Sequence, residues 1–271
     1  MFKGCTAITR WEIDMHNLVS AEEMFSGCTG LTYWQSHTTS LVNGSGMFLG
    51  CSNLSDLQMR TGTVENGSRM FYNCTKLKEV KMTAQNTDSN GYDYSSLKIA
   101  DEMFNYTAVE KFGDADNAVA MPNLLTARGM FANTAKFNGS SSFNIQTSQN
   151  FVDASYMFAH SHIGYSASHS TSDTYFKISY AYQSGHTAAA YASSHYETTA
   201  NNTPKYGFLS NTTGMFKECK NITTFNDKAC DTSNVVNGEG MFYNCENLYS
   251  FTASLACLLN GYNMFCGCKL D

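Results

Sequence analysis

A short phrase, Met-Phe-x-x-Cys-x-x-Leu-x-x-Leu, recurs along the chain and limits what the chain can fold into; its clearest copy runs from Met47 to Leu57. The Met-Phe pair occurs ten times, and successive methionines are 23, 23, 23, 33, 27, 27, 58, 26 and 23 residues apart. Self-similarity at such a period is the signature of stacked repeats. One copy holds too few apolar side chains for a core of its own. We therefore predict that the copies stack and bury one continuous column.

The position four residues after each methionine is Cys in seven copies and a small hydroxyl residue in the other three, at Thr107, Thr134 and Ser161. A disulfide would not tolerate that exchange, whereas a small, half-polar buried side chain would, since free Cys behaves as a compact hydrophobe. The column therefore predicts reduced, structural thiols. Three cysteines lie outside the column, and local pairing among them stays open: Cys230, Cys257 and Cys266.

The segment after each cysteine alternates between apolar and polar residues. Leu57 and Met59 alternate with Asp56 and Gln58, which predicts a strand with one buried face. One strand per coil, always in the same direction, gives a parallel sheet with strands ~4.8 Å apart. The outward polar positions form the candidate binding face of the sheet: Tyr33, Gln35, Asp56, Gln58, Glu79, Lys81, Thr224 and Asn226.

The segment that returns from the sheet contains Asn-Gly pairs, such as Asn43-Gly44 and Asn66-Gly67, which favour turns with positive φ. Apolar residues around the Met-Phe pair then follow a near-helical spacing, which predicts a helical turn or two opposite the sheet. The predicted fold is a repeat solenoid, with a parallel β-sheet on one face and short helical turns or loops on the other. It forms a single solenoid of about ten coils over residues 1–271.

Two longer steps between methionines predict insertions. Residues 85–94 read as a short polar loop, and residues 160–210 as an inserted Tyr/His/Ser-rich segment, which we favour over two coils with one eroded motif. Tyr among small polar residues is the composition of adaptable recognition loops. A poorly ordered surface loop is the equally weighted alternative. The candidate binding tyrosines of the insertion are Tyr165, Tyr175, Tyr180, Tyr182, Tyr191 and Tyr196.

Composition excludes some partners. Lys and Arg number 17 against 23 Asp and Glu, a net charge of −6, which does not favour nucleic acid. We find no apolar run long enough to span a membrane and no secretion signal. The chain begins and ends in mid-repeat. We therefore expect a fragment with its export signal or anchor outside, and uncapped coils able to meet end to end.

Catalytic and metal chemistry find little support in the sequence. His160 and His162, with His169 nearby, could bind a metal, but a site needs three or four converging ligands, so we predict no metal and no cofactor. Asp56 and Glu79 on successive strands resemble the paired carboxylates of glycan hydrolases, yet Lys81 is their charged neighbour and the rest of the face is uncharged. The sequence predicts a protein that is not an enzyme.

The repeat resembles the BspA-like leucine-rich-repeat family of bacterial surface proteins. The resemblance rests on the recurring phrase and on two fuller matches, residues 230–242 (Cys-Asp-Thr-Ser-Asn-Val to Met-Phe) and residues 145–158. It covers about four fifths of the chain and omits the 160s to the 200s. It implies a leucine-rich-repeat solenoid, adhesion to host proteins or cells, and no shared catalytic residues. The chain departs from the family in its 23-residue period and its Tyr/His insertion.

Two functions follow from these observations. The first is a non-enzymatic, surface-exposed binding or adhesion module, extracellular or on the cell surface, which presents the sheet face and the Tyr-rich insertion to a protein or glycan on a host or neighbouring cell. The alternative is a structural or receptor-binding component of a phage particle or other extracellular assembly. Flanking sequence distinguishes them, since an export signal or lipid anchor favours the first.

Overall fold

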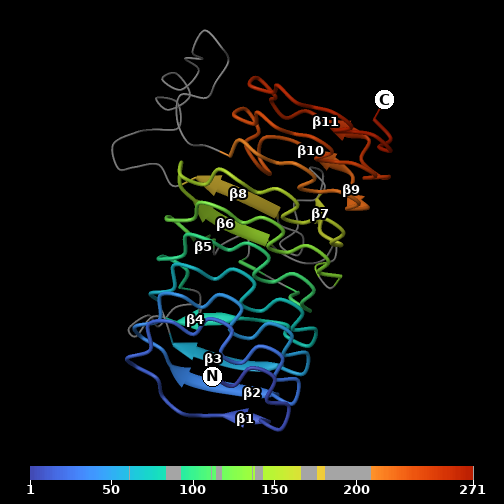
Figure 1. Ribbon diagram of the computed structural model, residues 1–271. Coiled ribbons are helices and arrows are strands. Elements are labelled where there is room, and N and C mark those ends of the chain that lie inside the picture. Colours follow the sequence, from blue (N-terminus) through green and yellow to red (C-terminus); the bar gives the residue numbers. More distant parts are fainter. Residues whose placement is uncertain are drawn as a thin grey trace.

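The chain winds into a solenoid whose coils stack along one axis, from the N-terminal coil at one end to the C-terminal coil at the other (Figure 1). The computed structural model describes residues 1–60, 62–83, 93–110, 112–113, 118–135, 137, 143–165, 176–180 and 209–270. All strand pairings among these residues are parallel. The predicted solenoid with a parallel sheet along one side is therefore confirmed.

The strands of the described residues fall into four sheets. The first contains β1 (Arg10–Trp11), β2 (Tyr33–His37), β3 (Asp56–Arg60) and β4 (Lys81–Thr83), in that order. The second contains β5 (Val119–Ala120), β6 (Phe143–Thr147) and β8 (Phe176–Tyr180). Two further pairs join β7 (Gly164–Tyr165) to β9 (Asn221–Ile222), and β10 (Thr224–Phe225) to β11 (Ser250–Phe251).

The register of the first sheet follows the 23-residue period. Tyr33 pairs with Arg10 on one side and Asp56 on the other. Along β3, Leu57 and Met59 are buried while the residues between them are exposed, as the alternation predicts. The repeat length thus fixes which side chains share a column, because parallel strands offset by one full coil stay in register.

Phenylalanine rings form the centre of the rod. The ring of each Met-Phe pair stacks on the next, with centroids 5.2–5.8 Å apart and planes within 19°. The stacked residues are Phe2, Phe25, Phe48, Phe71, Phe104, Phe131, Phe158, Phe216, Phe242 and Phe265. The predicted continuous buried column is confirmed.

The side opposite the sheet consists of turns, and the predicted helical turns are not found among the described residues. Every second amide donates within the coil: Met24 N–H donates to the Ala21 carbonyl at 3.0 Å, and Cys28 N–H to the Phe25 carbonyl at 3.0 Å. The intervening amides donate to the next coil, as Phe25 N–H does to the Met47 carbonyl at 2.9 Å. A helix would keep all these bonds within the segment, so the stacking of coils replaces it.

Positive φ lies beside the methionine and not at the Asn-Gly pairs, so that prediction is wrong. Apart from Gly113 (φ 75°), the left-handed positions are the residue before a Met-Phe methionine and the third after it, such as Glu23 (φ 50°) and Gly27 (φ 72°). The side-chain oxygen of Asn43 instead accepts the Ser45 backbone N–H at 3.1 Å. A Cβ on Gly44 would lie 3.0 Å from the Met70 methyl carbon of the next coil. Close packing, rather than turn geometry, explains the small residue there.

The cysteine column bonds one coil to another. The Cys51 thiol donates to the Phe25 carbonyl at 3.1 Å, whereas Thr107 at the same repeat position donates to the Phe104 carbonyl of its own coil at 2.7 Å. Burial raises the pKa of the Cys51 thiol to about 12. All ten cysteines are free, including Cys230, Cys257 and Cys266. The prediction of reduced, structural thiols is therefore confirmed.

Coils on either side of the longest step are in direct contact. Phe158 N–H donates to the Met215 carbonyl at 2.9 Å, and the Phe158 and Phe216 rings stack at 5.6 Å. Part of the intervening segment joins the sheets, because β8 pairs with β6 and Ile178 bridges to Cys230. Four of the candidate tyrosines lie outside the described residues: Tyr175, Tyr182, Tyr191 and Tyr196. Tyr165 and Tyr180 end the strands β7 and β8.

Most of the shorter predicted insertion also lies outside the described residues. Its last residue, Tyr94, is 1% exposed, and its hydroxyl donates to the Val80 carbonyl at 2.9 Å. Tyr94 is therefore a core residue that packs against the end of the preceding coil.

Candidate functional site

Four of the predicted site residues lie together on the outward side of β2 and β3, a surface called here the outer face. Tyr33 and Gln35 project from β2, and they pair in register with Asp56 and Gln58 on β3. Gln58 pairs in turn with Lys81 of β4. Asp56 and Gln58 are exposed, as is Gln35. These positions form a grid with ~4.8 Å between strands and nearly 7 Å between successive outward residues of one strand.

Tyr33 is a large side chain of the outer face that contacts two neighbouring side chains. The guanidinium carbon of Arg10 lies 4.0 Å from the centre of the Tyr33 ring, within the range of a cation–π contact. The Tyr33 hydroxyl donates a hydrogen bond to the Gln35 side-chain oxygen. Arg10 itself donates to the Glu12 carboxylate at 2.6 Å. Because Arg10 and Gln35 both contact Tyr33, a ligand that binds the ring has less side-chain entropy to remove.

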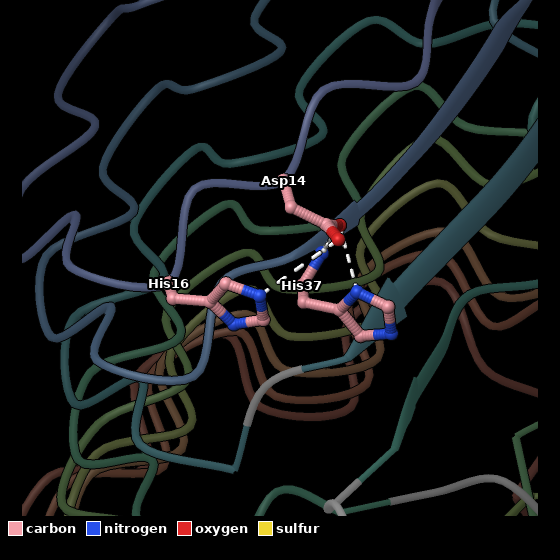
Figure 2. A group of neighbouring side chains, drawn as sticks. All are labelled: Asp14, His16 and His37. Atoms are coloured by element: carbon pink, nitrogen blue, oxygen red, sulfur yellow. Dashed lines mark hydrogen bonds and ion pairs between the residues drawn. The ribbon is translucent and has the colours of Figure 1, made fainter.

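Beyond Gln35, β2 ends at His37, which meets two side chains of the first coil (Figure 2). Asp14 Oδ1 accepts the His37 backbone N–H at 2.9 Å and lies 2.7 Å from His37 Nδ1. The His37 side-chain hydrogen bond, followed by that of the His37 backbone, lowers the pKa of Asp14. The His16 ring stacks on the His37 ring at 5.4 Å and 8°. Two imidazoles and one carboxylate therefore meet at the end of the outer face.

The remaining predicted residues of the sheet lie apart from the outer face or at its margin. Thr224 is in β10, whose sheet with β11 lies toward the C-terminal end of the rod (Figure 1). Asn226 follows that strand, and its side chain accepts the Lys228 backbone N–H at 3.0 Å. Glu79 is exposed just before β4. The predicted face is thus divided, and its larger continuous part is N-terminal.

The histidines first considered for metal binding line an open pocket of about 390 Å³ with Glu218, Lys220 and Asn221. His160 Nδ1 lies 3.1 Å from the Glu218 carboxylate. The His162 carbonyl accepts a hydrogen bond from Asn221 at 2.7 Å, which fixes its backbone. His169 lies outside the described residues. His160, His162 and Glu218 do not form a three-ligand cluster, and the Lys220 ammonium in the pocket disfavours a cation.

Comparison with known families matches this architecture. Residues 1–114 match the family described as "BspA type Leucine rich repeat region (6 copies)". Residues 81–167 and 203–257, more than half of the chain, match the family described as "Mycoplasma protein of unknown function, DUF285". The chain belongs to the DUF285 family and carries BspA-type leucine-rich repeats. The resemblance drawn from the Met-Phe-x-x-Cys phrase is confirmed.

A solved leucine-rich-repeat protein from Bacteroides ovatus is similar over 88% of this DUF285 chain and 76% of its own, with 12% identity and a TM-score of 0.31. No curated protein matches the chain. Neither matching family is described as an enzyme.

Among the described residues, no helix is long and apolar enough to cross a membrane.

The sequence of this leucine-rich-repeat protein did not lead us to predict the group of Asp14, His16 and His37. One signal was available, because the 23-residue period places Asp14 one coil below His37 in the same outward column. His16 is 21 residues from His37 and so does not share its column. Its approach depends on the turn after β1, which the repeat does not specify.

Proposed function

We propose that this BspA-type repeat chain is a non-enzymatic binding module that presents the outer face of β2 and β3 to a protein or glycan ligand on a host or neighbouring cell. The observation that carries the proposal is Tyr33, whose ring lies under the Arg10 guanidinium and whose hydroxyl is hydrogen-bonded to Gln35 among exposed polar residues. Repeat solenoids use such extended, regular surfaces for binding.

The chemistry of the outer face supports this class of ligand. A tyrosine ring offers contact area to a sugar ring or an apolar side chain, and Tyr is enriched among residues that dominate binding energy. Gln35 and Gln58, paired across β2 and β3, each offer a donor and an acceptor to hydroxyl or peptide groups. Arg60 and Asp56 give the face both signs of charge, which suits a neutral or mixed ligand better than a polyanion.

The cellular location that we propose for the chain rests on its family. We place the chain outside the cell or on its surface, because the BspA-like family that it resembles consists of bacterial surface proteins. The Tyr-rich segment between residues 160 and 210 is proposed as a second contact region on its composition alone.

The test is binding of the tag-free chain to cells, extracellular matrix proteins and a glycan array, followed by surface plasmon resonance with any ligand found. Tyr33→Ala should weaken binding at least about 30-fold, since loss of a dominant aromatic contact costs about 2 kcal/mol or more. The matched control is Tyr249→Ala, which removes a tyrosine that is 53% exposed just before β11. The proposal for this face fails if Tyr33→Ala and Gln58→Ala bind as tightly as the unaltered chain.

A further inference from the structure

Asp14, His16 and His37 bring three metal-binding groups together on the surface of the first two coils (Figure 2). Each can offer one ligand atom, and those atoms lie within 4.8 Å of one another. Among the described residues this is the group that meets that spacing with three such side chains. We propose that it is a binding site for a divalent transition-metal ion of the zinc type.

The distances suit such an ion. Zinc binds nitrogen and oxygen at about 2.0–2.2 Å, which separates two tetrahedral ligand atoms by about 3.4 Å. His37 Nδ1 lies 2.7 Å from Asp14 Oδ1, and His16 Nε2 lies 3.8 Å from Asp14 Oδ2. One separation is slightly short and the other slightly long. Small side-chain rotations of exposed groups are therefore enough to close the site around an ion.

The site is held by the fold and not by a single loop. Asp14 and His16 follow β1, whereas His37 ends β2, and the pairing of those strands sets their register. The backbone reinforces it, because His37 N–H donates to Asp14 at 2.9 Å and Met15 N–H donates to the His37 carbonyl at 3.0 Å.

An ion pair between Asp14 and His37 is the simpler explanation, but it leaves His16 unexplained. The His16 ring lies parallel to the His37 ring, at 8° and 5.4 Å, with its Nε2 turned toward the same carboxylate (Figure 2). One ion bound by the carboxylate and by both imidazoles accounts for the positions of all three side chains.

The two imidazoles and one carboxylate indicate which ions the site would prefer and how many ligands the protein supplies. Two imidazoles with one carboxylate favour zinc, copper, nickel or cobalt over calcium and magnesium, which prefer oxygen. The side chains of Asp14, His16 and His37 are 46%, 57% and 30% exposed. Three protein ligands at a solvated surface leave a coordination position for water or for an outside group. A bound ion would also link the first coil to the second.

The test is calorimetric titration of the tag-free full chain with zinc chloride. To separate this site from any zinc bound by the other histidines, the readout is the difference between the unaltered chain and a His16→Gln, His37→Gln double variant. That variant should lose one equivalent of zinc, and each single change should weaken this site at least about 10-fold. Far-UV circular dichroism checks that the exposed substitutions leave the fold intact.

His160→Asn is the matched control, because it removes an exposed histidine that also pairs with a carboxylate, Glu218. Asn is tolerated at this left-handed position, where Asn133 and Asn244 stand in other coils. The control should bind zinc at Asp14, His16 and His37 as the unaltered chain does. Anomalous density at the zinc edge should lie between these three side chains. Equal zinc stoichiometry and affinity in the double variant, or zinc density only elsewhere, overturns the proposal.

Discussion

Replacing Phe71 by alanine tests whether the phenylalanine column holds the rod together. Phe71 is 0% exposed, and its ring stacks on Phe48 and Phe104 at 5.6 Å each, with interplanar angles of 7° and 4°. A buried Phe→Ala change costs about 3–5 kcal/mol, through lost transfer free energy and the cavity left behind. Two ring contacts worth roughly 0.5–1.5 kcal/mol each are included in that loss. We expect Phe71→Ala to reduce the free energy of unfolding by about 4 kcal/mol.

The assay is urea unfolding followed by far-UV circular dichroism and by tryptophan fluorescence. Both tryptophans, Trp11 and Trp34, lie in the coils before Phe71, so fluorescence reports on that end of the rod. Each coil of a solenoid contacts only its neighbours, so a break at Phe71 should also separate the two signals into different transitions. Phe71→Leu keeps much of the apolar volume and should cost about 1–2 kcal/mol. A loss below about 1 kcal/mol for Phe71→Ala, with coincident transitions, refutes the reasoning.

Two further predictions concern the cysteines. Thiol labelling of the native protein at pH 8 should modify the exposed Cys5 and Cys266 quickly. The buried column thiols, such as Cys51, should react only after unfolding, because burial opposes formation of the reactive thiolate. Fast modification of Cys51 in the native protein would contradict this. Cys74→Thr should lower the free energy of unfolding in urea by less than about 1.5 kcal/mol, since the Thr107 hydroxyl finds a hydrogen-bond acceptor at this repeat position. Cys74→Leu should lower it by more, about 1–3 kcal/mol, because the larger side chain overpacks the core. Equal losses for the two variants would argue against a small half-polar site.

The sheet could be predicted from the sequence because its register is a direct consequence of repeat length. A period of 23 residues places Leu57 beside Trp34, and the alternation around Leu57 states which side is buried. Both signals are local and agree with each other. For the same reason four outer-face residues, from Tyr33 to Gln58, could be placed together before any coordinates were known.

The turns could not be predicted, because the competing interactions lie between coils. Apolar residues near the Met-Phe pair have a helical spacing, yet Phe25 N–H bonds to Met47 of the next coil and not to a carbonyl one turn back. Side-chain periodicity indicates which residues are buried, but it does not indicate which carbonyls accept the backbone N–H groups. The same limit applies to Gly44, whose size is set by Met70 of the following coil.

The histidine pair shows where a repeat stops specifying function. Regular columns arise where each coil has the same residue type as its neighbour. They therefore indicate which residues pack together, but they do not indicate a site that occurs in only one coil. Asp14 and His37 differ by the repeat length, but His16 does not, and no other pair of coils reproduces the trio among the described residues. The stacking of the coils therefore does not account for the position of His16. That is the physical reason to look for a ligand at the end of β2 before looking along the uniform remainder of the rod.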